Sequence, residues 1–423
     1  MIRRPPRSTL SSSSAASDVY KRQDHNMMVM FERTGDHLEK KPKYTPRQRL
    51  WYIRAKEVLL STGSIERPIV FGNNDTPGVF LSAAAKEYMK VYGVLIGKKP
   101  IIFTNNDSAY ETAIEFKKNG VNPIVLDTRE DQNSELINEA KDLDIKIKFS
   151  YAVIVAHGYK KVKSATIGKL DKDKIDFENT EQIDCDSICV SGFWTPTVHL
   201  ASQSGNKLKF NDSIDAFVPD KSKQNEHSLG AANGTFTLQD TLKNSFNTGS
   251  EVSKSITKKD EKIQIPNTNE RKYSAHDKFW CSPLPEGKNY KRFLDFQNDV
   301  AVSDIEVALR EGYRSIEHVK RYTTLGMATD QGRTSNLNGL QLVANVEKKI
   351  VPQVGHTTFR PPFTPVTIGT IVGREIGKEY MPTRKTPMHH WHEKNNAVWV
   401  LSLIHISEPT RPRLISYAVF CLK

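Results

Sequence analysis

The sequence predicts an α/β fold built from parallel strands, followed by a small helical domain. Apolar runs of strand length alternate with helical patterns between residues 80 and 127, which is the order of βαβ units. Two apolar runs end in small residues, at Ser61-Thr62-Gly63 and at Ser191-Gly192, which lets a ligand approach the backbone at the end of a parallel strand. Helical periodicity then dominates residues 291–350.

The chain is organised around the run from Val58 to Leu60. This run has the apolar composition of a buried strand and ends abruptly in small residues. A second apolar run, Ile69 to Phe71, lies between turn signals. An ordinary strand and turn would also explain the small residues. A new helix and a βαβ unit begin within about twenty-five residues, however, and this indicates a crossing between two domains.

Length and cysteine content limit the protein class. A chain of 423 residues can form two or three domains with a sizeable core. Four cysteines do not make a disulfide scaffold or a zinc site, and Cys185 and Cys189 lie in an apolar run that suits core packing. A reducing compartment fits this usage, so we expect a cytoplasmic protein.

The two ends differ from the middle. Residues 1–23 are basic and rich in serine, as in a transit peptide, but they and residues 401–423 look like translated sequencing-adapter read-through. The apolar run from Val398 to Ile406 is too short to span a bilayer. The formal charge of the whole chain is +12; the two ends contribute +4 and +2, which leaves +6 for residues 24–400. That charge comes without an aromatic-interleaved basic stripe, so we expect neither nucleic-acid nor membrane binding.

Residues 24–54 read as β-structure that leads into the Leu60 strand. No complete βαβ unit precedes that strand. If the S-T-G element is a late strand of a dinucleotide-binding domain, the first strand, glycine loop and first helix of that domain are missing. We therefore expect the nucleotide fold to be incomplete.

A second nucleotide-like unit follows. We expect a helix over 80–92, a strand over 101–103, a helix over 109–118 and a strand over 123–127 that ends in Asp127, where a dinucleotide fold places its ribose ligand. Thr104, Asn106 and Ala109 stand at the three glycine positions, which prevents close approach of a pyrophosphate to the backbone. The unit is either a functional nucleotide-binding site or a nucleotide fold that lacks its glycine-rich phosphate-binding loop.

A further helix is expected over 134–141, mostly β-structure over 144–190, and a strand over 214–218. A second cluster of small residues, 228–235, then opens a helix over 237–246. Free N–H groups at such a helix start suit an anion such as pyrophosphate, although tight packing of helix on strand explains the cluster equally well.

The C-terminal third begins with polar residues 247–275, which indicate a solvated linker. Helices follow, the first with a capping box that starts at Ser303. Residues 357–367 are Pro-rich and extended, so they either tie domains together or touch a ligand. Three histidines, His389, His390 and His392, suggest a metal site, but they cannot converge on one helix and no second cluster accompanies them. No metal site is predicted.

Several of these stretches resemble the alpha subunit of heterotetrameric sarcosine oxidase. The most specific are TNNDSAY at 104–110 and VKRYTTLGMATDQG at 319–332; they are accompanied by STGSIERPIVFGNNDTPGV, SGFWTPTVHL, LGAANGTF, TTFRPPFTPVT and RKTPMHHWH. The resemblance spans about residues 27–398. It identifies the chain as a truncated fragment of that family between adapter-like ends.

The resemblance implies an oxidoreductase acting on CH–NH donors. In the family, sarcosine, O2 and tetrahydrofolate give glycine, H2O2 and 5,10-methylenetetrahydrofolate. The alpha subunit binds NAD, FMN lies at the subunit interface, FAD sits in the beta subunit, and tetrahydrofolate binds a C-terminal domain like the glycine-cleavage aminomethyltransferase. The partners are the beta, gamma and delta subunits, and the fragment alone is expected to be inactive.

The resemblance also implies which residues bind cofactors. It implies no catalytic and no metal-binding residues. The NAD candidates surround the S-T-G end and the returning small-residue cluster: Thr62, Gly63, Ser64, Arg67, Gly230, Ala231 and Ala232. The degenerate second loop adds Asn105, Asn106 and Asp107. The surface facing FMN and the partner subunit is assigned to the loop from Thr323 to Gln331 and to Arg360, with Thr323, Thr324, Asp330 and Gln331 as its candidates.

The expected fold class is thus α/β, an incomplete two-dinucleotide-binding-domain (FAD/NAD(P)-binding, Rossmann-like) fold plus a small helical domain. The expected order is residues 1–23 adapter-like and disordered; 24–80 with 180–250 the remnant of the first dinucleotide-binding domain; 81–179 the inserted second one; 251–290 a linker; 291–350 the helical domain; 351–400 a connector and the start of the folate-binding domain; and 401–423 adapter-like.

Two other functions remain open. One is a subunit of another flavin-dependent amine or opine dehydrogenase, which requires an intact first glycine loop. The other is a non-catalytic scaffold that keeps a degenerate nucleotide fold to hold partners, for which TNNDSAY in place of glycines is the best support.

Overall fold

The computed structural model describes residues 14–15, 26–35, 38–40, 43–172, 174–258, 264–269, 273–373 and 387–397. The chain divides into two compact units, Met1–Val366 and Thr367–Lys423, which are described separately. The first unit holds two nucleotide-like folds and a helical segment.

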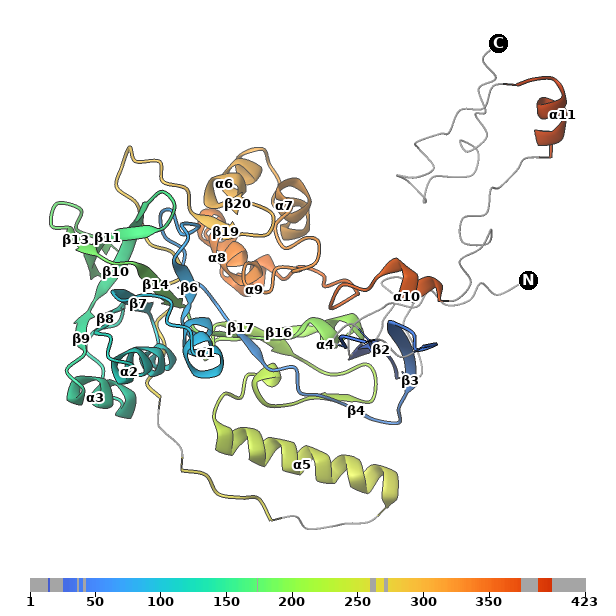
Figure 1. The fold of residues 1–423 in the computed structure, drawn as a ribbon, viewed down its shortest axis with the longest axis horizontal. Coiled ribbons are helices and arrows are strands. Elements are labelled where there is room, and N and C mark those ends of the chain that lie inside the picture. Colours follow the sequence, from blue (N-terminus) through green and yellow to red (C-terminus); the bar gives the residue numbers. More distant parts are fainter. Residues whose placement is uncertain are drawn as a thin grey trace. The chain divides into compact units, whose positions relative to one another are not determined.

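A five-stranded parallel sheet forms the second nucleotide fold (Figure 1). Its strands, in spatial order, are β6 (Val79–Leu81), β14 (Ser187–Ser191), β7 (Pro100–Thr104), β8 (Ile124–Asp127) and β9 (Lys146–Phe149). All five residues of β7 are buried, as expected for a central parallel strand covered on both faces. The sheet therefore extends beyond residues 81–179, because β6 and β14 also belong to it.

Three helices cover one face of this sheet: α1 (Ser82–Tyr92), α2 (Tyr110–Lys118) and α3 (Glu135–Asp142). Side chains of the sheet alternate between two cores, as period-two geometry requires. Ile102 and Val125 pack with the helices, whereas Ile101, Phe103 and Leu126 pack on the opposite face.

An antiparallel layer covers that opposite face. It consists of β10 (Tyr151–Gly158), β11 (Val162–Asp171), β12 (Lys174–Ile175) and β13 (Glu181–Asp184). Val155 and Ile167 of this layer share a core with Phe71 and Phe103, whose rings meet edge to face at 6.0 Å. The parallel sheet is thereby fixed between helices and strands.

The first nucleotide fold centres on a parallel pair, β4 (Val58–Leu60) and β18 (Glu226–Ser228). The strands expected over 24–54 are present as the antiparallel hairpin of β2 (Met27–Arg33) and β3 (Gln48–Arg54), and β1 (Ser14–Ala15) pairs with β2. The remaining elements of this fold are β5 (Ser64–Glu66), β15 (Trp194–Pro196), α4 (His199–Gln203), β16 (Leu208–Asn211), β17 (Ala216–Pro219), the short 3-10 helix η2 (Gly230–Asn233) and α5 (Leu238–Thr257).

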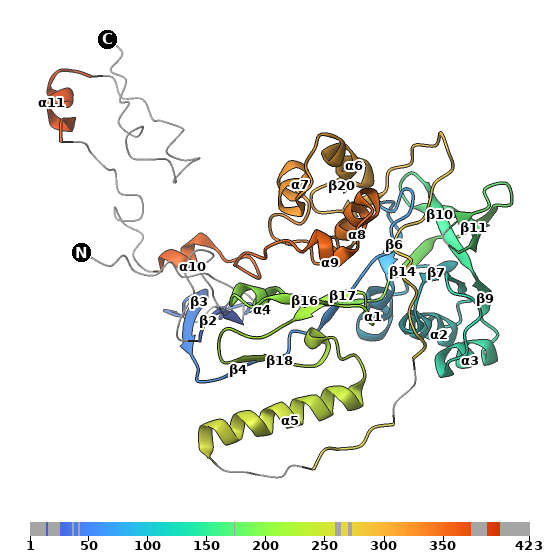
Figure 2. The ribbon, with the colours of Figure 1, turned by 180° about the vertical axis from the view of Figure 1, so that it is seen from behind.

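Helix α5 runs alongside the β4–β18 pair in both views (Figures 1 and 2). Thr237 caps its start by accepting a hydrogen bond from the Asp240 N–H. The helix continues to Thr257 without one buried residue, so the linker expected from residue 247 begins as helix. Residues 264–269 and 273–292 carry neither helix nor extended strand.

The helical segment is compact. It comprises β19 (Phe293–Asp295), β20 (Val300–Ala301), α6 (Val302–Arg310), α7 (Ile316–Thr323), α8 (Asn336–Glu347) and α9 (Val351–Val354). Ile305, Val319 and Val343 share one core with Val218 of the first nucleotide fold. The capping box predicted from Ser303 is wrong by two residues: Asp304 accepts a hydrogen bond from the Ala301 N–H at 2.8 Å.

The second unit contributes α10 (Ile368–Val372) and α11 (His389–Lys394) among its described residues. Across the described ranges, no helix combines the length and the apolar character that a membrane crossing requires.

Candidate functional site

Three of the predicted motifs meet at one cavity of about 460 Å³. Ser64 reaches it from the S-T-G end, Ala231 from the returning small-residue cluster, and Asn106 and Asp107 from the turn of the second nucleotide fold. These residues are far apart in sequence, so the fold alone brings them together. The cavity is the candidate functional site.

The S-T-G end lies where β4 leaves the sheet. Gly63 has a φ of +72° and open space around its missing side chain, while the Thr62 hydroxyl donates to the Thr197 carbonyl at 2.9 Å. Ser64 begins β5, which pairs with β15. Because carboxyl ends of parallel strands form ligand crevices, this position suits a nucleotide.

Arg67, predicted to bind a cofactor, lies in the interior of the fold. It is only 3% exposed, and its guanidinium donates to the carbonyls of Gly192 and Asp215 at 2.8 and 3.0 Å. These contacts hold together segments that are far apart in the sequence. Arg67 does not line the cavity.

The small-residue cluster lies at the end of β18, beside the end of β4, where the Leu229 N–H donates to the Leu60 carbonyl at 2.9 Å. A side chain at Gly230 would come within 2.9 Å of Thr241, so this glycine allows α5 to pack closely. Ala232 is also buried. Of the three predicted residues, Ala231 is the one that lines the cavity.

Aromatic rings form a second part of the cavity wall. His276 stacks on Phe193 with ring centroids 4.0 Å apart and planes 5° apart, and Phe236 meets Phe193 edge to face at 5.3 Å. The Trp194 indole donates to the Ser108 hydroxyl at 3.0 Å. Sequence reasoning missed Phe236, although it ends the LGAANGTF stretch, and missed His276, which lies in no motif.

Charged groups complete the cavity. Glu66 is 4% exposed, and its carboxylate accepts the Ala83 N–H at 2.7 Å at the start of α1. Lys86 and Glu111 form an ion pair at 2.5 Å. Burial raises the pKa of Glu66 to about 7, against the hydrogen bonds and the Lys86 charge that lower it.

Glu66 is expected to make stability depend on pH. Its pKa rises from 4.5 to about 7 on folding, so the folded state binds more protons than the unfolded state between these values, and stability falls as pH rises through that window. Relative to Glu66→Gln, the wild-type chain should lose up to about 3 kcal/mol between pH 4.5 and 7. Urea unfolding at several pH values measures this. Glu87→Gln, on the exposed side of α1, is the control, and parallel pH profiles of wild type and Glu66→Gln would refute the assignment.

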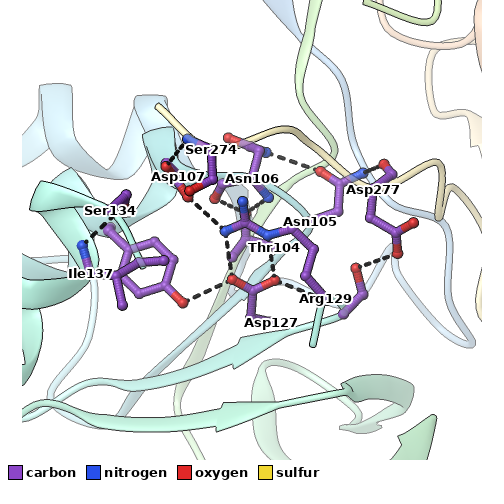
Figure 3. A network of polar contacts seen from close by, with 12 residues as sticks. Thr104, Asn105, Asn106, Asp107, Asp127, Arg129, Ser134, Ile137, Ser274 and Asp277 are labelled. Atoms are coloured by element: carbon purple, nitrogen blue, oxygen red, sulfur yellow. Dashed lines mark hydrogen bonds and ion pairs between the residues drawn. The ribbon is translucent and has the colours of Figure 1, made fainter. Parts of the chain in front are cut away.

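The turn of the second nucleotide fold is filled by its own side chains (Figure 3). Asn106 accepts hydrogen bonds from the N–H and hydroxyl of Ser108 at 3.0 and 2.6 Å. Arg129 Nη2 lies 2.8 Å from Asp107 Oδ1 and 2.7 Å from Asp127 Oδ2. Asn105, Asn106 and Asp107 are at most 2% exposed. Asp127, expected to face a ribose, instead accepts from Tyr110 and Arg129.

A second cavity, of about 310 Å³, lies in the helical segment. It joins the loop predicted to face FMN, represented by Met327 and Gln331, with Arg360. Gln331 ties the two together: its amide nitrogen donates to the Pro362 carbonyl at 2.8 Å, and its oxygen accepts the Arg360 N–H at 2.9 Å. Lys320 and Arg321 also line this cavity, beside the single carboxylate of Glu317.

The other predicted loop residues lie outside that cavity's lining. The Thr323 hydroxyl donates to the Val319 carbonyl at 2.8 Å, and Thr324 ends α7 with a φ of +65°. The Asp330 N–H donates to Gln297 at 2.8 Å. These three residues shape the loop.

In the described ranges, no group of three or more His, Cys, Asp or Glu side chains could hold a metal ion. Cys185 and Cys189 are buried free thiols whose pKa values are raised by burial. They pack in the two cores of the parallel sheet, as the sequence suggested.

The curated relatives that the chain matches carry one common name. The chain is 34% identical to sarcosine oxidase subunit alpha of Rhizobium meliloti (strain 1021) over 386 residues, which cover 89% of this chain and 37% of that protein. It is 34% identical to the corresponding subunit of Corynebacterium sp. (strain P-1) over 378 residues, covering 87% of this chain and 39% of that protein. Residues 289–374 match the family model of the sarcosine oxidase A3 domain. The expected resemblance is confirmed, and the chain spans less than half the length of these relatives.

Among solved structures, the chain resembles the crystal structure of L-proline dehydrogenase from P. horikoshii, with a TM-score of 0.56 and 19% identity. The match covers 85% of this chain and 64% of that one. At this identity the likeness shows the fold alone. It confirms the predicted α/β class with a parallel sheet.

Proposed function

We propose that this chain, which matches sarcosine oxidase alpha subunits over nearly nine-tenths of its length, serves as the nucleotide-binding subunit of an oxidase acting on sarcosine. The proposed overall reaction converts sarcosine, O2 and tetrahydrofolate to glycine, H2O2 and 5,10-methylenetetrahydrofolate. The similarity to these subunits is the observation that carries the proposal. The chain would work with beta, gamma and delta partners.

NAD is the proposed ligand of the 460 Å³ cavity. The residues present fit a dinucleotide, since the ends of the parallel pair β4–β18 meet beside the cavity and small residues leave the backbone open there. Ser64 and Ala231 would contact the ligand. Thr62, Gly63, Gly230 and Ala232 would shape the two turns, and Arg67 would hold together the segments of Gly192 and Asp215.

Ala231→Trp is expected to block this cavity. The indole would occupy space that a nucleotide needs, so affinity for NAD should fall by roughly a hundredfold or more. Isothermal titration calorimetry with NAD measures the effect. Lys243→Trp adds the same side chain on an exposed position of α5 and should leave affinity unchanged. Equal affinities of the two variants would place the nucleotide elsewhere.

FMN is the proposed ligand at the 310 Å³ cavity, where the chain would meet the beta subunit. The donor set suits a phosphate: Lys320, Arg321 and Arg360 face one carboxylate, Glu317. The flavin supplies electron acceptance when bound, and this chain's residues position it. FAD is assigned to the beta subunit. Tetrahydrofolate is assigned to an aminomethyltransferase-like domain. Residues 384–392 resemble the start of that domain.

Co-expression with beta, gamma and delta subunits of a sarcosine oxidase tests the proposed function. Sarcosine should yield H2O2 only when this chain and its partners are present together, and glycine should accumulate in equal amount. L-Proline serves as the alternative substrate, because the fold is shared with a proline dehydrogenase. Oxidation of L-proline but not of sarcosine, or a complex that excludes this chain, would reject the proposal.

A further inference from the structure

The crevice of the second nucleotide fold is occupied by the chain itself. Residues Ser274–Phe279, called the strap below, cross the carboxyl ends of β7 and β8, where open α/β sheets bind their ligands. Asn105 donates to the Asp277 carbonyl at 2.7 Å, and the Asp277 N–H donates back to the Asn105 carbonyl at 2.9 Å (Figure 3). Asn105 also donates to the Phe279 carbonyl at 3.1 Å.

Three further contacts seat the strap. The Ser274 N–H donates to Asp107 Oδ2 at 2.6 Å, and Arg129 donates to the Ala275 carbonyl at 3.1 Å. The Thr128 hydroxyl donates to Asp277 Oδ2 at 3.1 Å. Asn105, Asp107, Thr128 and Arg129 all belong to the turns after β7 and β8, so residues of the turns that would surround a dinucleotide bind a peptide instead.

The charges at this crevice oppose a pyrophosphate. Asp107 stands at the start of the helical turn that leads into α2, which is the position that an anionic ligand takes in a nucleotide fold. It is 2% exposed, and Arg129, the cation nearest to it, is shared with Asp127. A phosphate there would meet two buried carboxylates and one guanidinium that is already neutralised.

The strap also forms part of the neighbouring cavity. Ser274, Ala275 and His276 line the 460 Å³ cavity, and the His276 ring stacks on Phe193. Burial, and then the charge of Arg67, lowers the pKa of His276 to about 4, so the ring is neutral near pH 7. Its Nε2 is buried and lacks a hydrogen-bond partner among the described residues. A planar, neutral ring in the cavity wall suits contact with a planar heterocycle.

We infer that the second nucleotide fold has exchanged its dinucleotide for the strap, and that Asn105, Asp107 and Arg129 thereby position His276 in the wall of the nucleotide cavity. The inference rests on the proposed function for the identity of that ligand, the heterocyclic end of NAD. The three side chains are positioning residues, since they act on the ligand through the strap.

Hydrogen–deuterium exchange and NAD titration test this inference in the co-expressed complex. Asn105→Ala removes two hydrogen bonds to the strap, and Thr128→Val removes one with little change of shape. The amides of Ser274 and Asp277 should exchange about tenfold faster in these variants. NAD should bind roughly three- to tenfold more weakly, because the ring of His276 is no longer held.

Ser134→Ala is the matched control. It removes the cap of α3 in the same fold, where Ser134 accepts the Ile137 N–H, and it has no contact with the strap. It should lower stability without changing strap exchange or NAD affinity. Strap exchange that is unchanged in Asn105→Ala and Thr128→Val, or faster exchange with unaltered NAD affinity, would overturn the positioning role.

A third readout separates this inference from the proposed function. NAD should protect the amides of residues 61–64 and 229–233 in the wild-type complex and leave the strap bound to Asn105. Faster exchange of the Ser274 and Asp277 amides in the presence of NAD would show that the ligand displaces the strap, and would overturn the exchange of dinucleotide for strap. If NAD protects neither 61–64 nor 229–233, the proposed nucleotide site is wrong. The exchange rates of the Ser274 and Asp277 amides in the variants then still test whether Asn105 and Thr128 hold the strap.

Discussion

Replacing Arg129 by Met is expected to lower the free energy of unfolding by roughly 3–5 kcal/mol, the usual cost of leaving a buried charge without its partner. Arg129 is 5% exposed and lies 2.8 and 2.7 Å from Asp107 and Asp127. Methionine keeps an unbranched apolar side chain but removes the guanidinium, which leaves two carboxylates facing each other in the interior. Urea unfolding of wild type and variant at neutral pH measures the loss.

Two further variants test the cause of that loss. Lys118→Met removes an ion pair with Glu139 on the surface of the same fold and should change stability by less than about 1 kcal/mol. Adding Asp107→Asn to Arg129→Met should recover part of the lost stability, because one uncompensated charge is then removed. An Arg129→Met chain within about 1 kcal/mol of wild type would show that the network contributes little.

Removing Lys320 and Arg360 together is expected to abolish flavin binding at the helical cavity. Each cation can form a charge-assisted hydrogen bond with a phosphate, worth about 1.5–3 kcal/mol, so Lys320→Met with Arg360→Met should weaken FMN binding by roughly 10²–10⁴-fold. Lys320 is already oriented, since its ammonium donates to the Thr358 carbonyl at 3.2 Å. Burial lowers the pKa of this lysine, and the charges of Arg360 and Arg321 lower it further, so a bound anion would offset this loss.

The FMN content of the purified complex, determined separately from its FAD, measures that effect. Arg310→Met, an exposed cation on α6 that lies outside the cavity lining, is the control and should keep its flavin. Full FMN content in the double variant would show that FMN does not bind in this cavity. Loss of flavin in the control as well would indicate a general effect of charge on assembly.

The parallel sheet was predictable because its signals are local. Apolar runs such as Ile101–Phe103 and the capping residues beside them fix strands and helices within a few positions, and the fold confirmed them. The end of α5 was not, since its residues beyond Phe246 are mostly polar and the helix buries no residue that would mark its length. Surface helices of this kind leave little trace in a sequence.

The strap shows why the site was only partly predictable. TNNDSAY indicated that the glycine-rich loop is absent. The segment that takes the place of the dinucleotide, however, lies about 170 residues further along the chain. No local pattern links Asn105 to Asp277. Likewise, His276 reaches the cavity through tertiary packing and lies in no motif, whereas Ser64, Ala231 and Phe236 lie in motifs that could be recognised.

A crystal structure of the co-expressed complex with NAD tests the central claim most directly. One dinucleotide per chain should lie at the ends of β4 and β18, beside Ser64 and Ala231, with the strap still bound to Asn105 and Arg129. A dinucleotide seated on the turn at 104–109, with the strap displaced, would contradict the claim.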